Sequence, residues 1–181
     1  PSTCIMTLPS ATVTGDTFTV PLLVDKADGI LGADISISYD SSILTALKVE
    51  TTSYAGSFAL ASNLDAAGKI RLSLFGTMPL SGSGTVAKIT FGVIGDIREV
   101  SALTIESVNL NEGAILVDKV NGSILPPPRT EITITAIPDG RIVTIDGTDY
   151  PTPQTFTWVE GSEHTLSAIP SQGDVSTRYV F

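Results

Sequence analysis

Residues of the types that most often carry catalytic chemistry are few in this chain. His164 is the only histidine, so any Ser–His–Asp nucleophilic arrangement would have to use it. No nucleophile elbow of the form Gly-x-Ser-x-Gly lies near it. We therefore expect His164 to lie on a strand face of a small distal module, and we expect no catalytic residue in the chain.

Carboxylates are more plentiful, but their spacing does not favour sugar hydrolysis. A glycosidase needs two carboxylates at a defined separation, together with an aromatic platform for the sugar. No such pair is found among the acidic residues of the first two thirds of the chain, which include Asp34, Asp40, Glu50, Asp65, Asp96, Glu106 and Glu112. The sequence therefore predicts that the protein is not an enzyme.

The tetrapeptide Asp146-Gly147-Thr148-Asp149 resembles half of a calcium-binding loop. It lacks the alternating acidic ligands and the terminal Glu of an EF-hand. Asp-Gly instead provides the positive φ that a tight hairpin turn requires, so we predict a turn here. The sequence has no phosphate-cradling glycine loop, Cys/His cluster or basic patch. We therefore expect no metal and no cofactor.

Cys4 is the only cysteine, so an internal disulfide is impossible. One interpretation is a small apolar side chain buried under the first strand, as is usual for an unpaired cysteine. The other is a tether or an intermolecular bridge near an exposed terminus.

Composition restricts the partners and the location of the protein. The chain has 181 residues, of which 16% are charged, and a formal net charge of −9. Nucleic acid and anionic membrane surfaces both select for Lys and Arg, so neither is an expected partner. No apolar run approaches the roughly 20 residues that span a bilayer, so we expect no membrane insertion. Because the sequence begins at Pro1 without a charged leader, we expect a secreted protein whose signal has been removed, located outside the cell or at its surface.

The stretch from Gly29 to Val49 shows how the chain is organised. Ile35, Ile37 and Tyr39 alternate with small polar residues, which is typical of a half-buried strand. Lys69–Phe75 alternates in the same way. One face of each strand would then form a core and the other an exposed surface.

Short strand-like segments, bounded by Gly, Asp and Pro, continue along the whole chain, which predicts an all-β sandwich. Pro21 interrupts one of them and predicts an edge strand or a bulge there. Three consecutive prolines at 126–128 favour a stiff spacer. We predict a β-sandwich at 1–125, a linker at 126–130 and a small β module at 131–181. The strands expected in the first domain include 4–8, 11–13, 17–24, 33–39, 69–75, 85–94, 103–110, 113–117 and 122–125.

The order of these segments resembles a cohesin module, over roughly residues 13–125. The resemblance rests on Tyr39-Asp40 followed by Ile43-Leu44, on Gly84-Thr85-Val86-Ala87 before a buried strand, and on the segments GDTFTVPLLVDKADGILGADISISYDSSILTALKV, GKIRLSLF, GTVAKITFGV and GAILVDKVNGSI. It implies a jelly-roll β-sandwich that binds a dockerin module and thereby holds other proteins on a scaffold or a cell surface.

The resemblance also implies where a partner would bind. In cohesins the dockerin-binding face is built by the strands that correspond to 33–39 and 69–75. Carried over by position, the outward residues are Asp34, Ser36, Ser38, Arg71, Ser73 and Phe75, flanked by the loop 80–84. Phe and Arg are common interface anchors, and hydroxyl groups form adaptable hydrogen bonds, so this surface would suit a helical partner. The alternative is that the six residues form only a solvated sheet face.

The second region is similar to a small repeat module of exported bacterial and archaeal proteins, which implies a spacer. The likeness lies in IPDG at 137–140 and VTIDGTDYPTPQTFTWVEGSEHTLSA at 143–168. The sequence ends in the hydrophobic segment TRYVF at Phe181. We expect either that the module is cut there or that another chain completes it.

Two other functions are kept open. Carbohydrate binding is compatible with the fold, although we expect no row of exposed aromatic residues for stacking on sugars. The chain would otherwise be a protomer of a surface fibre, assembled by addition of a strand from a neighbouring copy to an open sheet edge.

Overall fold

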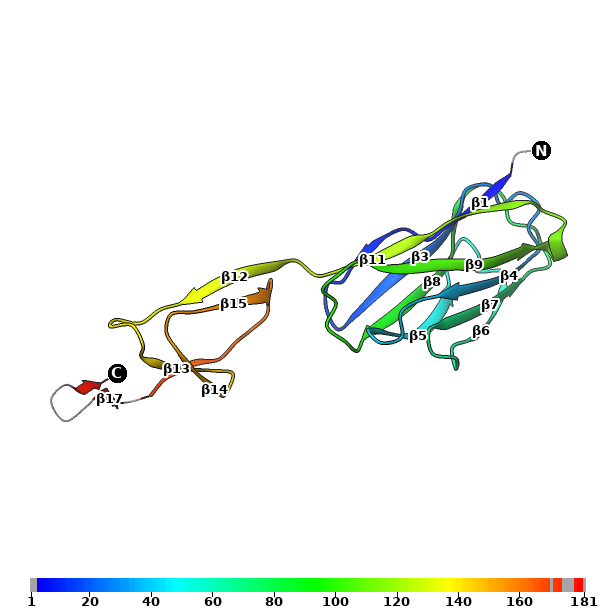
Figure 1. Ribbon diagram of the computed structural model, residues 1–181. Helices are drawn as coiled ribbons and strands as arrows, with labels where there is room; N and C mark the ends of the chain where they lie inside the picture. The colour runs from blue at the N-terminus through cyan, green and yellow to red at the C-terminus, as the bar shows by residue number, and fades with distance from the viewer. Residues whose placement is uncertain (1–2, 170, 174–177, 181) are drawn as a thin grey trace. The chain divides into compact units, whose positions relative to one another are not determined.

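The computed structural model describes residues 3–169, 171–173 and 178–180. It divides into two compact units, Pro1–Pro126 and Pro127–Phe181, which are drawn in Figure 1. Each unit is built from β-strands, and the only helical segment among the described residues is one short 3₁₀ turn, η1 (Asn111–Gly113). No helix in the described part of the chain is long and apolar enough to cross a bilayer.

The first unit is a sandwich of two sheets, as the alternating segments predict. One sheet has the strand order β10 (Val117–Val120), β1 (Cys4–Thr7), β3 (Thr17–Val24), β8 (Gly84–Val93) and β5 (Leu44–Thr51). The other has the order β2 (Ala11–Thr12), β11 (Gly122–Leu125), β9 (Ser101–Leu110), β4 (Gly32–Ser38), β7 (Lys69–Phe75) and β6 (Ala59–Asn63). The all-β sandwich prediction is confirmed.

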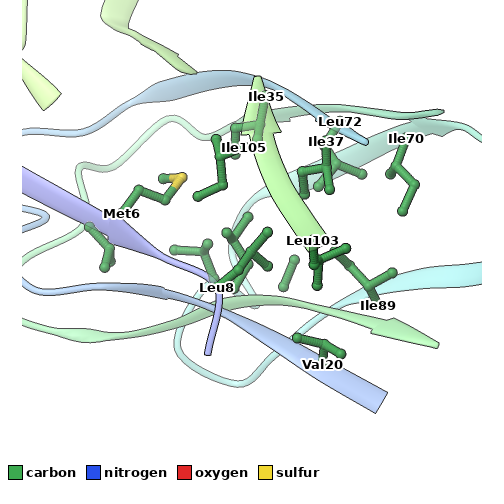
Figure 2. Packing of buried hydrophobic residues seen from close by; sticks show 14 of the residues in the cluster. Met6, Leu8, Val20, Ile35, Ile37, Ile70, Leu72, Ile89, Leu103 and Ile105 are labelled. Carbon is green, nitrogen blue, oxygen red and sulfur yellow. The ribbon is translucent and has the colours of Figure 1, made fainter. Parts of the chain in front are cut away.

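The core of the first unit lies between the two sheets. Strands of both sheets send every second side chain inward, so that Ile35 and Ile37 of β4 belong to the same core cluster as Val20 and Ile89 of the opposite sheet (Figure 2). All four side chains are buried. This contact between the sheets fixes which residues of β4 must point outward, because neighbouring residues of a strand face opposite sides.

Two local predictions for this unit are confirmed. Cys4 is buried and unpaired, and its burial raises the pKa of the thiol, with a further contribution from the charge of Asp25. At Pro21, strand β3 has an open edge, because β1 pairs with β3 only at Leu23 and Val24, and the register against β8 shifts between Leu22 and Leu23. A residue without an N–H group is therefore accommodated.

The predicted strand at 113–117 is wrong. Three consecutive residues at and just before its predicted start, Asn111, Glu112 and Gly113, have positive φ and form η1. Ile115 makes only an isolated bridge to Leu110, and the next strand, β10, begins at Val117. Left-handed backbone cannot continue a strand, so the chain turns before it enters the other sheet.

The described residues of the second unit form three small sheets. They are β12 (Arg129–Ile134) with β15 (Gln154–Val159); β14 (Thr148–Pro151), β13 (Ile142–Ile145) and β16 (Leu166–Ala168); and β17 (Ser171–Gly173) with β18 (Arg178–Val180). The hairpin at Asp146-Gly147 is confirmed, because both residues have positive φ and Ile145 pairs directly with Thr148. The expected linker at 126–130 overlaps β12, which begins at Arg129. The expectation for the chain end concerns Phe181, which lies outside the described residues.

Candidate functional site

The six residues predicted to point outward lie together on the six-stranded sheet. We call them the outer face: Asp34, Ser36 and Ser38 of β4, and Arg71, Ser73 and Phe75 of β7. Strands β4 and β7 pair antiparallel, which places Asp34 opposite Ser73 and Ser36 opposite Arg71. The Ser73 hydroxyl donates a hydrogen bond to the Asp34 carboxylate. Asp34, Arg71 and Phe75 are exposed, whereas the three serines are half-buried.

A charged pair that the sequence analysis did not place on the outer face crosses it between β7 and β9. Lys69 begins β7 and donates a hydrogen bond to the Glu106 carboxylate of β9, the strand on the other side of β4. Ser36 donates to the other Glu106 oxygen at 3.3 Å. The Lys69 ammonium, with smaller contributions from Ser36 and Ser38, holds the pKa of Glu106 below its ordinary value. The middle of the outer face is thus ordered by its own hydrogen bonds before any partner arrives.

The end of the outer face where β4 begins is more apolar. Phe75 is 60% exposed, and Gly76 donates a backbone hydrogen bond to Leu31, which is also exposed. A shallow depression lies beside Phe75, and its lining includes Leu31, Asp34, Asn109 and Glu112. An exposed ring beside a depression and two carboxylates is the part of this surface best suited to anchor another protein.

Asn111 holds this end of the outer face in place. Its Oδ1 accepts hydrogen bonds from the backbone N–H groups of Leu31 (2.8 Å) and Gly32 (2.9 Å), and its Nδ2 donates to the carbonyl of Gly29 (2.8 Å). The positive φ of Asn111 explains why an asparagine suits the position. No sequence motif marks this clamp, because its partners lie about eighty residues away in the chain.

The loop 80–84, expected to flank the outer face, lies against the segment that precedes β4. Leu80 accepts a hydrogen bond from Gly29 and donates one to Ile30, and the carbonyl of Gly82 accepts one from Ala27. Leu80 itself is buried. The loop is therefore anchored at the same end of the sheet as Phe75.

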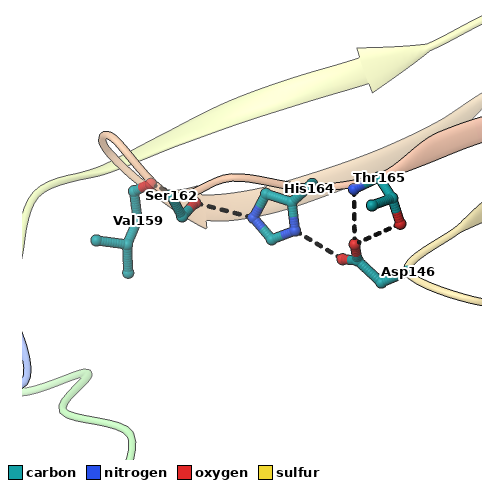
Figure 3. Close-up of polar contacts among 5 residues, drawn as sticks. All are labelled: Asp146, Val159, Ser162, His164 and Thr165. Atoms are coloured by element: carbon teal, nitrogen blue, oxygen red, sulfur yellow. Dashed lines mark hydrogen bonds and ion pairs between the residues drawn. The ribbon is translucent and has the colours of Figure 1, made fainter.

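The second unit contains a polar cluster, and the sequence did not predict that its residues lie close together. His164 Nδ1 lies 2.7 Å from Asp146 Oδ2, and His164 Nε2 lies 2.8 Å from the hydroxyl of Ser162, as Figure 3 shows. His164 precedes β16 and stacks on Trp158, with ring centroids 3.9 Å apart. The prediction of a strand-face histidine is therefore wrong, since its place is set by the Asp146 turn and the Trp158 ring.

This cluster has the connectivity of a nucleophilic triad, but its hydrogen bonds serve to join two turns. The Ser162 hydroxyl also lies 2.7 Å from the carbonyl oxygen of Val159, which competes with His164 for the single hydroxyl proton. Asp146 accepts further bonds from the N–H and the hydroxyl of Thr165. The His164 ring, with the N–H of Thr165, keeps the pKa of Asp146 below its ordinary value.

Neither unit offers a metal site in the part of the chain that is described, because no three His, Cys, Asp or Glu side chains converge there.

The aromatic rings are distributed unevenly between the two units. Phe75 is the one exposed Phe, Tyr or Trp among the described residues of the first unit. In the second unit the rings of Phe156, Trp158 and His164 stack on one another in this order, and Tyr150 meets Phe156 edge to face. Faces that are occupied by neighbouring rings are not free to stack on a sugar.

Comparison with known families identifies the first unit. The sequence model of the Cohesin domain family matches residues 6–126, which is most of the chain. The chain belongs to the cohesin domain family. The match ends where the first compact unit ends, so we refer to that unit as the cohesin domain. No curated protein matches the chain in sequence.

Solved structures share the fold of the cohesin domain at low sequence identity. A non-cellulosomal cohesin from the archaeon Archaeoglobus fulgidus is 19% identical with a TM-score of 0.62, covering 70% of this chain and 93% of its own. CaCohA2 of Clostridium acetobutylicum, in complex with CaDoc0917(R16D), is 22% identical with a TM-score of 0.62, covering 68% of this chain and 99% of its own. A Coh-OlpC–Doc435 complex of Clostridium thermocellum is 21% identical with a TM-score of 0.60, covering 70% and 94%.

Proposed function

We propose that the cohesin domain binds a dockerin-type protein through the outer face and so acts as a non-catalytic recognition and scaffolding module outside the cell. The observation that carries the proposal is the exposed Phe75 ring at the end of a flat row of small polar side chains, in a domain of the cohesin family. The structural relatives from the two Clostridium species are cohesins in complexes with dockerins. The relative from Archaeoglobus fulgidus is a non-cellulosomal cohesin, so our proposal does not require a cellulosome.

The outer face has the physical properties of a recognition surface. The Lys69–Glu106 pair and the Asp34–Ser73 hydrogen bond hold the polar side chains in place, so less side-chain entropy is lost on binding. Arg71 and Phe75 are free to contact a partner, while the serines contribute hydroxyl groups to a helix laid across the strands. Arg and aromatic residues are frequent hot spots of binding energy, whereas a flat surface of hydroxyl groups contributes mainly shape complementarity.

The binding test uses the whole chain and the dockerin modules of the organism that makes it. The chain is immobilised, each dockerin is passed over it, and the dissociation constant is measured. A variant with Asp34→Ala, Arg71→Ala and Phe75→Ala should lose at least about tenfold in affinity, given the typical cost of truncating interface anchors. A control variant, Thr19→Ala with Lys88→Ala, changes the opposite sheet. Absence of binding to every dockerin by the folded chain, or an equal loss in the control, would refute the proposal.

We further propose that the two units are separate domains and that the second is a spacer. Its few buried residues, among them Val143, Ile145 and Thr152, and its stack of aromatic rings form a small core of their own. Limited proteolysis between the units should release two stable fragments, and fragments that unfold on cleavage would contradict this division.

Neither of the other functions is favoured by a specific observation. Carbohydrate binding needs a row of open rings, whereas Phe75 is isolated in the described part of the cohesin domain. The fibre hypothesis rests on the hydrophobic segment TRYVF at the end of the sequence and on an open sheet edge there. In the described residues this segment forms β18, which pairs with β17, and Phe181 lies outside them.

A further inference from the structure

The two sheets of the cohesin domain end in four edge strands, β10, β5, β2 and β6. Three of these edges carry features that prevent pairing with another chain. Strand β10 exposes the charged residues Asp118 and Lys119. Strand β5 has a register shift between Ala46 and Lys48 and also carries Glu50. Strand β2 is only two residues long.

Strand β6 lacks all of these protective features. Its sequence from Ala59 to Asn63 is ALASN, without a charge or a proline, and four of its five residues are exposed. It pairs with β7 over all five residues without a register shift. In the described part of the chain no strand pairs with its other side. A straight, neutral and exposed edge presents unpaired backbone groups to another strand.

The residues of β6 allow this edge to pair with a copy of itself. An antiparallel pair centred on Ala61 uses the whole strand and places Ala59 opposite Asn63, and Leu60 opposite Ser62. Two residues that lie opposite each other in this register are separated in sequence by an even number of positions. They therefore point to the same side of the joined sheet, so the core-facing side of β6 in one copy continues into the core-facing side of β6 in the other. All opposed side chains are small or neutral, so neither steric nor charge repulsion opposes the pairing.

The neighbouring strand is also compatible with this pairing. Asn63 pairs with Arg71 and Ala59 pairs with Phe75 within one copy. Since Asn63 of one copy lies opposite Ala59 of the other, Arg71 of one copy lies in line with Phe75 of the other across the two β6 strands. The two Arg71 side chains are not in line with each other. Ser73 lies in the central row with Ala61. Within these rows of β6 and β7, like charges do not meet across the contact.

We propose that two copies of this chain associate edge to edge through β6 and join their six-stranded sheets into one continuous sheet. The contact is isologous, so it closes as a dimer and does not propagate into a fibre. A five-residue edge makes a small contact, so the dimer is weak and forms only at high local concentration, as on a crowded surface. Its consequence is that two outer faces lie side by side in one sheet.

Sedimentation equilibrium over a concentration series tests the self-association. The wild-type chain should show a reversible monomer–dimer equilibrium. Ala61→Lys would place two ammonium groups opposite each other and should raise the dissociation constant about fivefold or more. Ala102→Lys, an exposed position on the inner strand β9, adds the same charge away from β6 and should leave the equilibrium unchanged. Wild-type chain that stays monomeric up to millimolar concentration, or an equal effect of both lysines, overturns the proposal.

A cross-linking pair tests the register independently of any effect of lysine on folding. Residues directly opposite in an antiparallel pair have Cα atoms about 4.5–5.5 Å apart, within the span of a disulfide. Ala61→Cys should therefore form a covalent dimer with oxidised glutathione. Ala59→Cys should not, because its two copies would be offset by four residues, about 13 Å. Cys4 is buried and does not compete. Equal cross-linking of the two variants would exclude the proposed register.

Discussion

Removal of the Phe75 ring is expected to weaken dockerin binding by about 1.5–3 kcal/mol, or roughly 10- to 150-fold in dissociation constant. Phe75 leaves 60% of its area exposed. A phenylalanine buries about 200 Å² in full, so about 120 Å² remains for a partner to cover. At about 25 cal/mol per Å² this area corresponds to about 3 kcal/mol. The lower bound allows for incomplete contact and for the methyl group that alanine keeps.

The assay for this prediction is isothermal titration of the Phe75→Ala variant with the dockerin that binds the wild-type chain most tightly. Leu47→Ala is the matched control, because Leu47 is similarly exposed, at 51%, but lies on β5 in the opposite sheet. The control should bind like the wild type. If the affinity of Phe75→Ala stays within about twofold of the wild type, the ring is not an anchor and the reasoning from its exposure is wrong.

Three further predictions concern stability. Gly122→Ala should lower the free energy of unfolding by about 1–3 kcal/mol, because its methyl group would lie 2.6 Å from the carbonyl oxygen of Pro9. Thermal denaturation checks it, with Gly15→Ala, where space is open, as the control. Asn111→Ala removes three hydrogen bonds and should cost about 2 kcal/mol in urea unfolding, whereas the exposed Asn109→Ala should cost little. The contact of Asp146 with His164 lowers the pKa of the carboxyl, so its stabilisation is complete above the ordinary value of 3.8 and is lost as the pH falls through the lowered pKa. Urea unfolding at a series of pH values should show this acid loss, and Asp146→Asn should remove it. An unchanged pH profile in the variant would count against the contact.

The alternation of side chains made the outer face predictable. Once Ile35 and Ile37 were assigned to the core, the neighbouring serines had to point away from it, and the same parity places Arg71 and Phe75 outward. The Lys69–Glu106 pair could not be predicted in the same way. It depends on β9 lying beside β4, and that neighbour relation comes from the topology of the whole sheet.

The second unit shows the same division between local and distant information. The Asp146-Gly147 turn was predictable because its cause, positive φ, lies within two residues. The position of His164 was not, because it depends on a turn eighteen residues earlier and on the ring of Trp158. The wrong strand at 113–117 has a similar origin. Its apolar residues suit a strand, but the left-handed turn is tied to Asn111, whose partners lie in the segment before β4.

The stack of aromatic rings has a practical consequence, because Trp158 is the only tryptophan in the sequence. It lies in the second unit, between the rings of Phe156 and His164. Selective excitation of indole fluorescence therefore follows the unfolding of that unit alone. Backbone circular dichroism follows both units, and most of its amplitude comes from the larger cohesin domain. The wild-type chain thus carries an optical label on one unit, so the order in which the two units melt can be determined without attaching a dye.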